Sequence, residues 1–212
     1  MTGATAAAPV EEQRASQELE ALISDRAQPP DSIASLLDQL GSELRPRVVR
    51  RLGKAAQRAL YEKVDGFRPL SLEELVPASR APLEEVRHFG RNTLPAFRIF
   101  EKRFCRLPGA AIGADDSVAG YNFQTMSGLT GPGYFLARVD ADRDEVLVDY
   151  GRLPSQKPTN WPEIRSNERG LGRLVYGFMV DRIRRVSEHV TIGSAAKHGK
   201  EIGSYFVLSR EA

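Results

Sequence analysis

The sequence predicts an α+β fold, in which an N-terminal helical region is followed by an antiparallel sheet of about five strands packed on one long helix. Three observations predict it. Apolar residues recur at helical spacing up to residue 106 of the 212-residue chain. Beyond residue 107, glycine and β-forming residues become frequent and apolar residues alternate with polar ones. The strand-like segments are joined by short turns, which connect antiparallel neighbours and are too short for parallel crossovers.

Residues 1–30 form an acidic N-terminal segment that we expect to be partly disordered and partly helical, with the helical composition over 10–26. Residues 31–106 follow as a helical region. Asp31 is a favourable N-cap, and the apolar spacing after it predicts a helix over 32–40.

A longer amphipathic helix is expected over 45–64, with Pro46 in its first turn. Its polar face is almost purely cationic, because basic residues recur at i, i+4, i+7 and i+11. Like charges at this spacing destabilise a helix, so something must offset them. The residues of this basic face are Arg47, Arg51, Lys54 and Arg58.

Ser71 and Glu74 have the spacing of a capping box and predict a short helix. A long helical region with bulky phenylalanines is expected over 82–106, interrupted at Pro95. A second basic face on this region includes Arg91, Arg98 and Lys102.

Residues 107–212 are expected to form the sheet and its covering helix, either alone or in one compact domain with 31–106. The clearest signal is a hairpin whose two strands flank the acidic turn 140–144. The other elements expected are a strand over 121–126, a long loop over 152–168, a helix over 170–187, and strands around 189–192 and 203–209.

The net charge of +2 hides a separation of charge along the chain. Residues 1–43 hold 2 basic and 8 acidic residues, whereas residues 44–106 hold 15 basic and 7 acidic ones. A basic middle segment attracts either an acidic partner or the acidic N-terminal segment of the same chain. Both alternatives stay open at the level of sequence.

Several chemistries find no support. The glycines around 193–199 and 170–172 lack the spacing and context of phosphate-binding loops. The three histidines and Cys105 do not have metal-ligand spacing, so no metal and no cofactor is expected. No catalytic constellation is recognised, which favours a binding role over an enzyme.

The predicted location is cytoplasmic. A single cysteine excludes an intrachain disulfide and favours a reducing compartment. No apolar run approaches the ~18 residues of a membrane-spanning helix, and the N-terminus does not resemble a secretory signal.

A polar and aromatic cluster around the long loop is the strongest candidate for a site. The first hypothesis is a non-catalytic protein that holds a small apolar or amphipathic ligand between the C-terminal sheet and helix. The alternative is that Trp161 covers the sheet while nearby arginines pair with Glu163 and Glu168. The candidate ligand-binding residues are Tyr121, Phe123, Tyr134, Tyr150, Trp161, Arg165, Arg169 and Tyr176.

The second hypothesis is an interaction module that docks an acidic partner, a protein or a nucleic acid, through the basic faces at 45–58 and 87–106. Nucleic acid is disfavoured, because no helix-turn-helix, zinc-finger or aromatic RNA-binding motif is present. The alternative for the first basic face is neutralisation by acids from residues 1–43.

Overall fold

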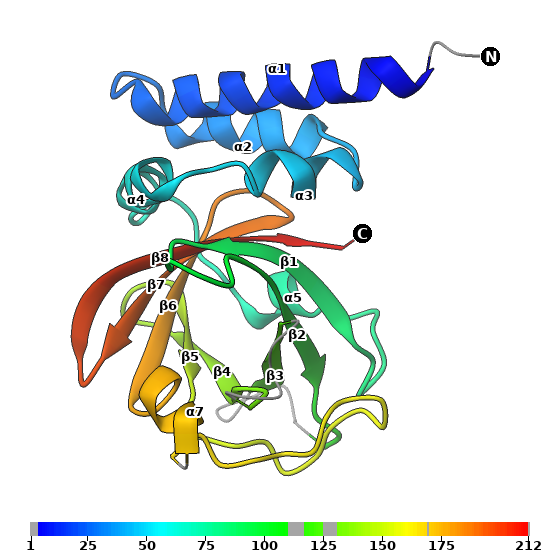
Figure 1. The fold of residues 1–212 in the computed structure, drawn as a ribbon, viewed down its shortest axis with the longest axis vertical. Coiled ribbons are helices and arrows are strands. Elements are labelled where there is room, and N and C mark those ends of the chain that lie inside the picture. Colours follow the sequence, from blue (N-terminus) through cyan, green and yellow to red (C-terminus); the bar gives the residue numbers. More distant parts are fainter. Residues whose placement is uncertain (1–3, 110–116, 125–130, 169, 212) are drawn as a thin grey trace.

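The structure is a computed structural model that describes residues 4–109, 117–124, 131–168 and 170–211. Within these residues, eight antiparallel strands form a closed barrel (Figure 1), in which each strand pairs with its neighbours in sequence and β8 closes on β1. The strands are β1 (Val86–Asn92), β2 (Ile99–Arg106), β3 (Val118–Phe123), β4 (Tyr134–Asp140), β5 (Glu145–Asp149), β6 (Met179–Arg185), β7 (Val190–Lys197) and β8 (Lys200–Arg210).

The predicted fold class, α+β with a sheet on one long helix, is therefore wrong. The segment 82–106, expected to be helical, contains the hairpin β1–β2. The expected helix over 170–187 is the short α7 (Gly170–Val175), after which the chain enters β6. Phe100 and Phe104 explain part of the error, because a spacing of four residues places two side chains on one face of a helix and also on one face of a strand.

In the described part of the chain, five helices precede the barrel. They are α1 (Ala4–Ser24), α2 (Pro30–Gln39), α3 (Leu44–Val49), α4 (Lys54–Lys63) and α5 (Leu72–Leu75). The expected helix over 32–40 is confirmed as α2. The expected basic amphipathic helix over 45–64 is wrong as a single helix, because the chain is extended at Gly53, the N-cap of α4.

Helices α1 to α4 form a layer over the outer face of β7, β8 and β1 (Figure 1). Their apolar side chains, such as Leu37 and Leu60, are fully buried in one core with Val190, Ile192 and Val207 of the barrel. Among the described residues, no helix combines the length and the apolar character needed to cross a membrane.

One end of the barrel is closed by α5, because Leu70, Leu75 and Val76 belong to the core inside the barrel. The predicted capping box of Ser71 and Glu74 is confirmed at the start of this helix. We call the opposite end the mouth. It carries the β1–β2 turn, the β7–β8 turn and α7, which lies at the lower left of the barrel in Figure 1.

The predicted hairpin across 140–144 is confirmed as β4 and β5, with Asp140 paired to Glu145. The two C-terminal strands are likewise confirmed as β7 and β8, joined by a turn at His198 and Gly199. The expected strand over 121–126 begins earlier, as β3, and residues 125 and 126 lie outside the described residues.

Candidate functional site

The barrel holds a cavity of about 80 Å³ that opens toward the mouth. Most of its wall is apolar and comes from side chains such as Phe100, Tyr176 and Phe206. Four buried polar side chains meet at this cavity, and we call them the lysine cluster. They are Lys102, Asn122, Tyr150 and Asp181.

Strand alternation brings the lysine cluster together. Lys102 lies on β2 between Phe100 and Phe104, and all three point into the barrel. Asn122 is its direct neighbour on β3, and Asp181 projects inward from β6. Tyr150 follows the last residue of β5.

Hydrogen bonds within the lysine cluster use every donor of the Lys102 ammonium. Its Nζ lies 3.1 Å from Asn122 Oδ1, 2.5 Å from Tyr150 Oη and 2.9 Å from Asp181 Oδ2. The Tyr150 hydroxyl donates to Asp181 Oδ2 over 3.0 Å and accepts from Asn122 Nδ2, also over 3.0 Å. The cluster is therefore a closed network with a neutral total charge when both ions are present.

Burial changes the acid–base properties of the cluster. Desolvation lowers the pKa of Lys102, and the charge of Asp181 acts in the opposite direction. Desolvation also raises the pKa of Tyr150 well above its ordinary value, and the nearby Asp181 charge adds to this effect. Tyr150 thus keeps its proton across the physiological pH range.

Aromatic rings surround the Lys102 ammonium on three sides. Nζ lies 4.9 Å from the ring centre of Phe135, 5.0 Å from that of Tyr150 and 4.9 Å from that of Phe206. The negative faces of Phe135 and Phe206 attract a cation at these distances, and more strongly when it is desolvated, whereas Tyr150 meets Nζ with its hydroxyl group. The site therefore stabilises a positive charge at Nζ.

Close packing at the mouth depends on Gly133. Its φ of +60° is unfavourable for other residues, and an added Cβ would lie 2.5 Å from the ring of Tyr176. Tyr176 in turn stacks on Tyr150, with ring centres 5.3 Å apart. This stack joins the segment after α7 to the lysine cluster.

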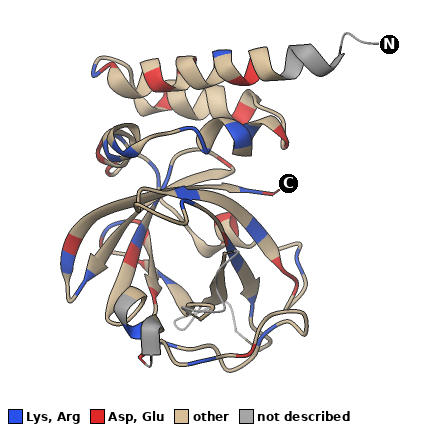
Figure 2. Ribbon diagram, in the orientation of Figure 1, with Lys and Arg blue, Asp and Glu red and all other residues tan. Residues whose placement is uncertain are grey.

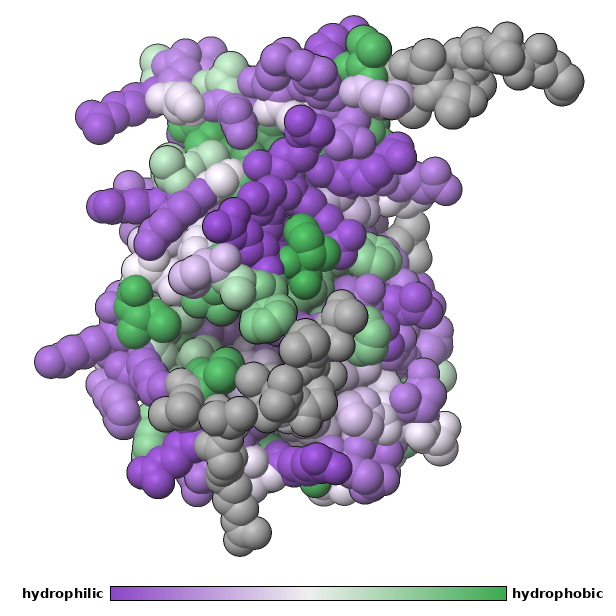
Figure 3. Space-filling view, in the orientation of Figure 1, coloured by the Kyte–Doolittle hydropathy of each residue, from purple (hydrophilic) through white to green (hydrophobic). Residues whose placement is uncertain are grey.

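Apolar side chains gather on the surface around the mouth, where Figure 3 shows hydrophobic atoms beside the barrel opening. The exposed members include Leu94 and Phe97 on the β1–β2 turn, Phe178 after α7 and Ile202 on β8. Two of them, Leu94 and Ile202, also line the cavity. An apolar molecule can thus contact the same surface outside and inside the barrel.

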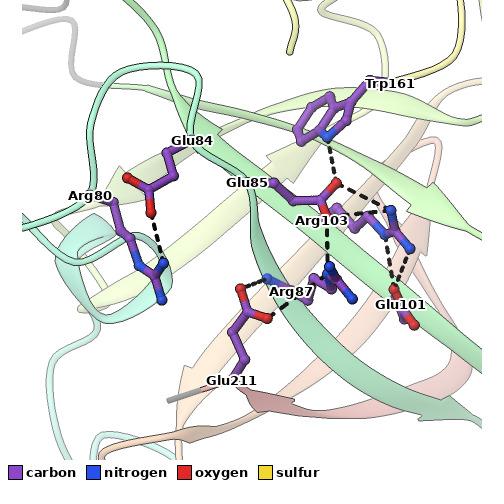
Figure 4. A network of polar contacts seen from close by, with 8 residues as sticks. All are labelled: Arg80, Glu84, Glu85, Arg87, Glu101, Arg103, Trp161 and Glu211. Atoms are coloured by element: carbon purple, nitrogen blue, oxygen red, sulfur yellow. Dashed lines mark hydrogen bonds and ion pairs between the residues drawn. The ribbon is translucent and has the colours of Figure 1, made fainter. Parts of the chain in front are cut away.

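A second buried group, which we call the outer aromatic cluster, lies on the outside of β2, β3 and β4. Trp161 packs on Tyr121 with ring centres 4.7 Å apart, and its Nε1 donates to Glu85 over 2.6 Å. Figure 4 shows Glu85 in contact with Arg103 as well, which also pairs with Glu101. Its buried members are Cys105, Ala119, Tyr121, Tyr134 and Trp161.

The structure separates the candidate ligand-binding residues into several groups. Tyr150 and Tyr176 line the cavity. Phe123 and Arg165 are exposed, and Arg169 lies outside the described residues. Tyr121, Tyr134 and Trp161 belong to the outer aromatic cluster, where Trp161 covers the sheet.

The basic residues proposed for partner docking do not share one face, and Figure 2 shows basic and acidic residues interspersed over the molecule. Arg47 and Arg51 pair with Glu12 of α1, at 3.6 Å and 3.1 Å, as expected from neutralisation by the acidic N-terminal segment. Arg58 pairs with Glu62 of its own helix, and Lys54 is exposed.

The second basic face, predicted for a helix over 82–106, does not exist, because these residues lie in and around the β1–β2 hairpin. Arg91 donates to the backbone oxygen of Arg50 over 2.7 Å, and Arg98 to that of Leu94 over 3.1 Å. Lys102 is 1% exposed and points into the cavity.

Sequence reasoning missed Asn122 and Asp181 and assigned Lys102 to a surface. A signal was available in the pattern of β2, where Lys102 stands at the same parity as Phe100 and Phe104. A lysine that shares a strand face with two phenylalanines is a candidate for burial. For Asp181 the corresponding signal is the apolar residues Met179 and Ile183 at the same parity.

The described residues include no group of three or more His, Cys, Asp or Glu side chains that could hold a metal ion. No family model, curated protein or solved structure matches the chain.

Proposed function

We propose that the protein binds a small molecule with an apolar body and a neutral polar head inside the barrel. The head reaches the lysine cluster inside the cavity. Because the cavity measures only about 80 Å³, the apolar body extends through the mouth onto Leu94 and Ile202. The barrel interior replaces the expected position between a sheet and a long helix, since residues 170–185 form α7 and β6 instead of one helix. A closed eight-stranded barrel is compatible with this role, because barrels of this size can hold one small ligand.

The observation that carries the proposal is a cavity with apolar walls that ends at four buried polar side chains. A few convergent polar groups in an apolar pocket are the usual composition of a small-molecule site. The apolar rim at the mouth supports entry of the ligand from this end.

The charges of the cluster favour a neutral head group. Lys102 and Asp181 compensate each other at 2.9 Å, so an ionic ligand would add a buried charge to a balanced pair. A hydroxyl or carbonyl group can instead exchange hydrogen bonds with the Tyr150 hydroxyl or the Asn122 amide.

Displacement of the fluorescent probe N-phenyl-1-naphthylamine tests the proposal. The probe should bind the protein, and octanol should displace it at lower concentration than octanoate or octylamine. Ala195 lines the cavity, so Ala195→Phe should fill the space and weaken probe binding by about tenfold or more, roughly 1.4 kcal/mol.

The matched control is Ala196→Phe, because Ala196 is the next residue of β7 and does not line the cavity. Circular dichroism establishes that both variants fold. Absence of probe binding to the unmodified protein, or equal loss in both folded variants, would contradict the proposal.

A further inference from the structure

Lys102 is a nucleophile in a position where a bound ligand can meet it. Its Nζ lies at the cavity that we propose as the ligand site, and its pKa is lowered by desolvation. A lowered pKa increases the share of neutral amine, which is the nucleophilic form of lysine. Asp181, at 2.9 Å, accepts the proton that the amine must release.

We propose that Lys102 binds aldehydes or ketones covalently, as an imine, inside the barrel. This inference rests on the proposed function and names the chemical class of its ligand. In the reaction, Nζ attacks the carbonyl carbon and a carbon–nitrogen double bond replaces the carbon–oxygen double bond. The carbonyl oxygen leaves as water and takes up two protons from the Lys102 ammonium, which becomes a protonated imine.

The charge balance of the cluster is the same before and after this reaction. An ammonium paired with Asp181 becomes a protonated imine paired with Asp181, so no buried charge is created or lost. The rings of Phe135 and Phe206 stabilise the protonated imine as they stabilise the ammonium. Burial therefore does not oppose the product.

Tyr150 and Asp181 provide the proton transfers. Asp181 takes a proton from the ammonium and later returns it to the departing hydroxyl. The pKa of Tyr150 is raised by burial, so its phenol keeps a proton that it can donate to the ligand oxygen. Its Oη, 2.5 Å from Nζ, then regains a proton from the nitrogen. Asn122 orients Lys102 and Tyr150, since its side chain accepts from the Lys102 ammonium and donates to the Tyr150 hydroxyl.

Reductive trapping tests the inference. The protein is incubated with octanal and sodium cyanoborohydride, which reduces an imine to a stable secondary amine, and the modified lysine is identified by peptide mass spectrometry. We expect modification at Lys102 at octanal concentrations that leave the exposed Lys54 and Lys200 unmodified. Excess octanol should protect Lys102 and leave the surface lysines unaffected.

Two variants separate chemistry from binding. Lys102→Arg keeps a cation but cannot form an imine, and Lys200→Arg is its matched control. Tyr150→Phe removes the proton donor, and trapping at Lys102 should slow by about a hundredfold, the lower end of the usual contribution of general acid–base catalysis. Any loss of octanol affinity in this variant, measured by displacement of the naphthylamine probe, should be smaller than the loss of the trapping rate.

The outcomes distinguish this inference from the function on which it rests. Displacement of the probe by octanal, with trapped adducts on surface lysines and none on Lys102, overturns the imine and leaves ligand binding intact. Absence of probe binding overturns both. Trapping at Lys102 in the unmodified protein is decisive even if a variant fails to fold.

Discussion

Lys102 and Arg103 are consecutive residues of β2, yet they belong to two different environments. Lys102 points into the barrel, where its charge is fully buried beside Asp181 and three aromatic rings. Arg103 points outward, pairs with Glu85 and Glu101, and lies 4.0 Å from the ring centre of Phe123. The Arg103 side chain keeps 15% of its exposure.

Because side chains alternate along β2, two neighbouring cations lie in different environments. Both cations have carboxylate and aromatic partners, but only the inner one meets a cavity. The outer aromatic cluster is filled by Trp161, which packs on Tyr121 and Tyr134. Lys102 is thus in reach of a ligand. Arg103 instead contacts Glu85, which also binds Trp161 and so holds the loop that carries Trp161 against the barrel.

The largest expected effect comes from breaking the buried ion pair between Lys102 and Asp181. Asp181→Leu leaves the Lys102 charge buried without its counter-ion and should lower the free energy of unfolding by about 3–5 kcal/mol. The double variant Lys102→Met/Asp181→Leu removes both charges and should regain most of this loss. Urea denaturation measures both.

The matched change in the outer environment is Arg103→Met. Because Arg103 and its two carboxylate partners keep 12–19% of their side-chain exposure, water screens these pairs only in part. Their loss should cost about 1–3 kcal/mol. Equal losses for Asp181→Leu and Arg103→Met would show that the inner pair is not desolvated as the structure indicates.

The next expected effect is a pH dependence of the free energy of unfolding, which arises from a second buried residue inside the barrel. His88 also faces the barrel interior, where it donates from Nε2 to the Leu75 oxygen, and burial lowers its pKa from 6.5 to about 3. Below pH 6.5 the His88 imidazole is protonated in the unfolded chain, whereas in the folded protein it stays neutral down to about pH 3. Stability should therefore fall by a few kcal/mol as the pH decreases from about 6.5 to about 3.

This loss is measured as the difference between the unmodified protein and His88→Gln in urea denaturation at each pH. His198→Gln is the control, because His198 is exposed on the β7–β8 turn. A His88→Gln profile with the same slope as the unmodified protein would contradict the assignment of this loss to His88.

The smallest expected effect lies in the outer aromatic cluster. Trp161→Phe keeps an aromatic ring but removes the hydrogen bond from Nε1 to Glu85. Because Glu85 still accepts from Arg87 and Arg103, the loss should cost about 0.5–1.5 kcal/mol in urea denaturation. Binding of the naphthylamine probe should change by less than about tenfold, or roughly 1.4 kcal/mol, because Trp161 does not line the cavity. A larger loss of probe affinity would place the ligand near the outer cluster instead.

Local signals predicted the elements that depend on local physics. The capping box at Ser71 and Glu74 and the hairpin across 140–144 are specified by residues close together in sequence. The hairpin β1–β2 was predicted as a helix because Phe100 and Phe104 fit both periods. Barrel closure was missed because it pairs β1 with β8, more than a hundred residues later.

The residues of the candidate site likewise divide into those that local signals identified and those that depend on long-range contacts. Tyr150 and Tyr176 were identified among the aromatic residues near the long loop, and both line the cavity. Asn122 and Asp181 carried no local motif. Asp181 reaches Lys102 across 79 positions of sequence, a contact that no short window contains.

The sequence by itself determined the hairpin across 140–144 and the helix α2, because turn preferences and helix spacing act over short distances. Only the tertiary structure decided that Lys102 is buried beside a cavity rather than exposed and solvated. The physical reason is that burial depends on which strands close into a barrel, and with it the desolvation that lowers the pKa of Lys102.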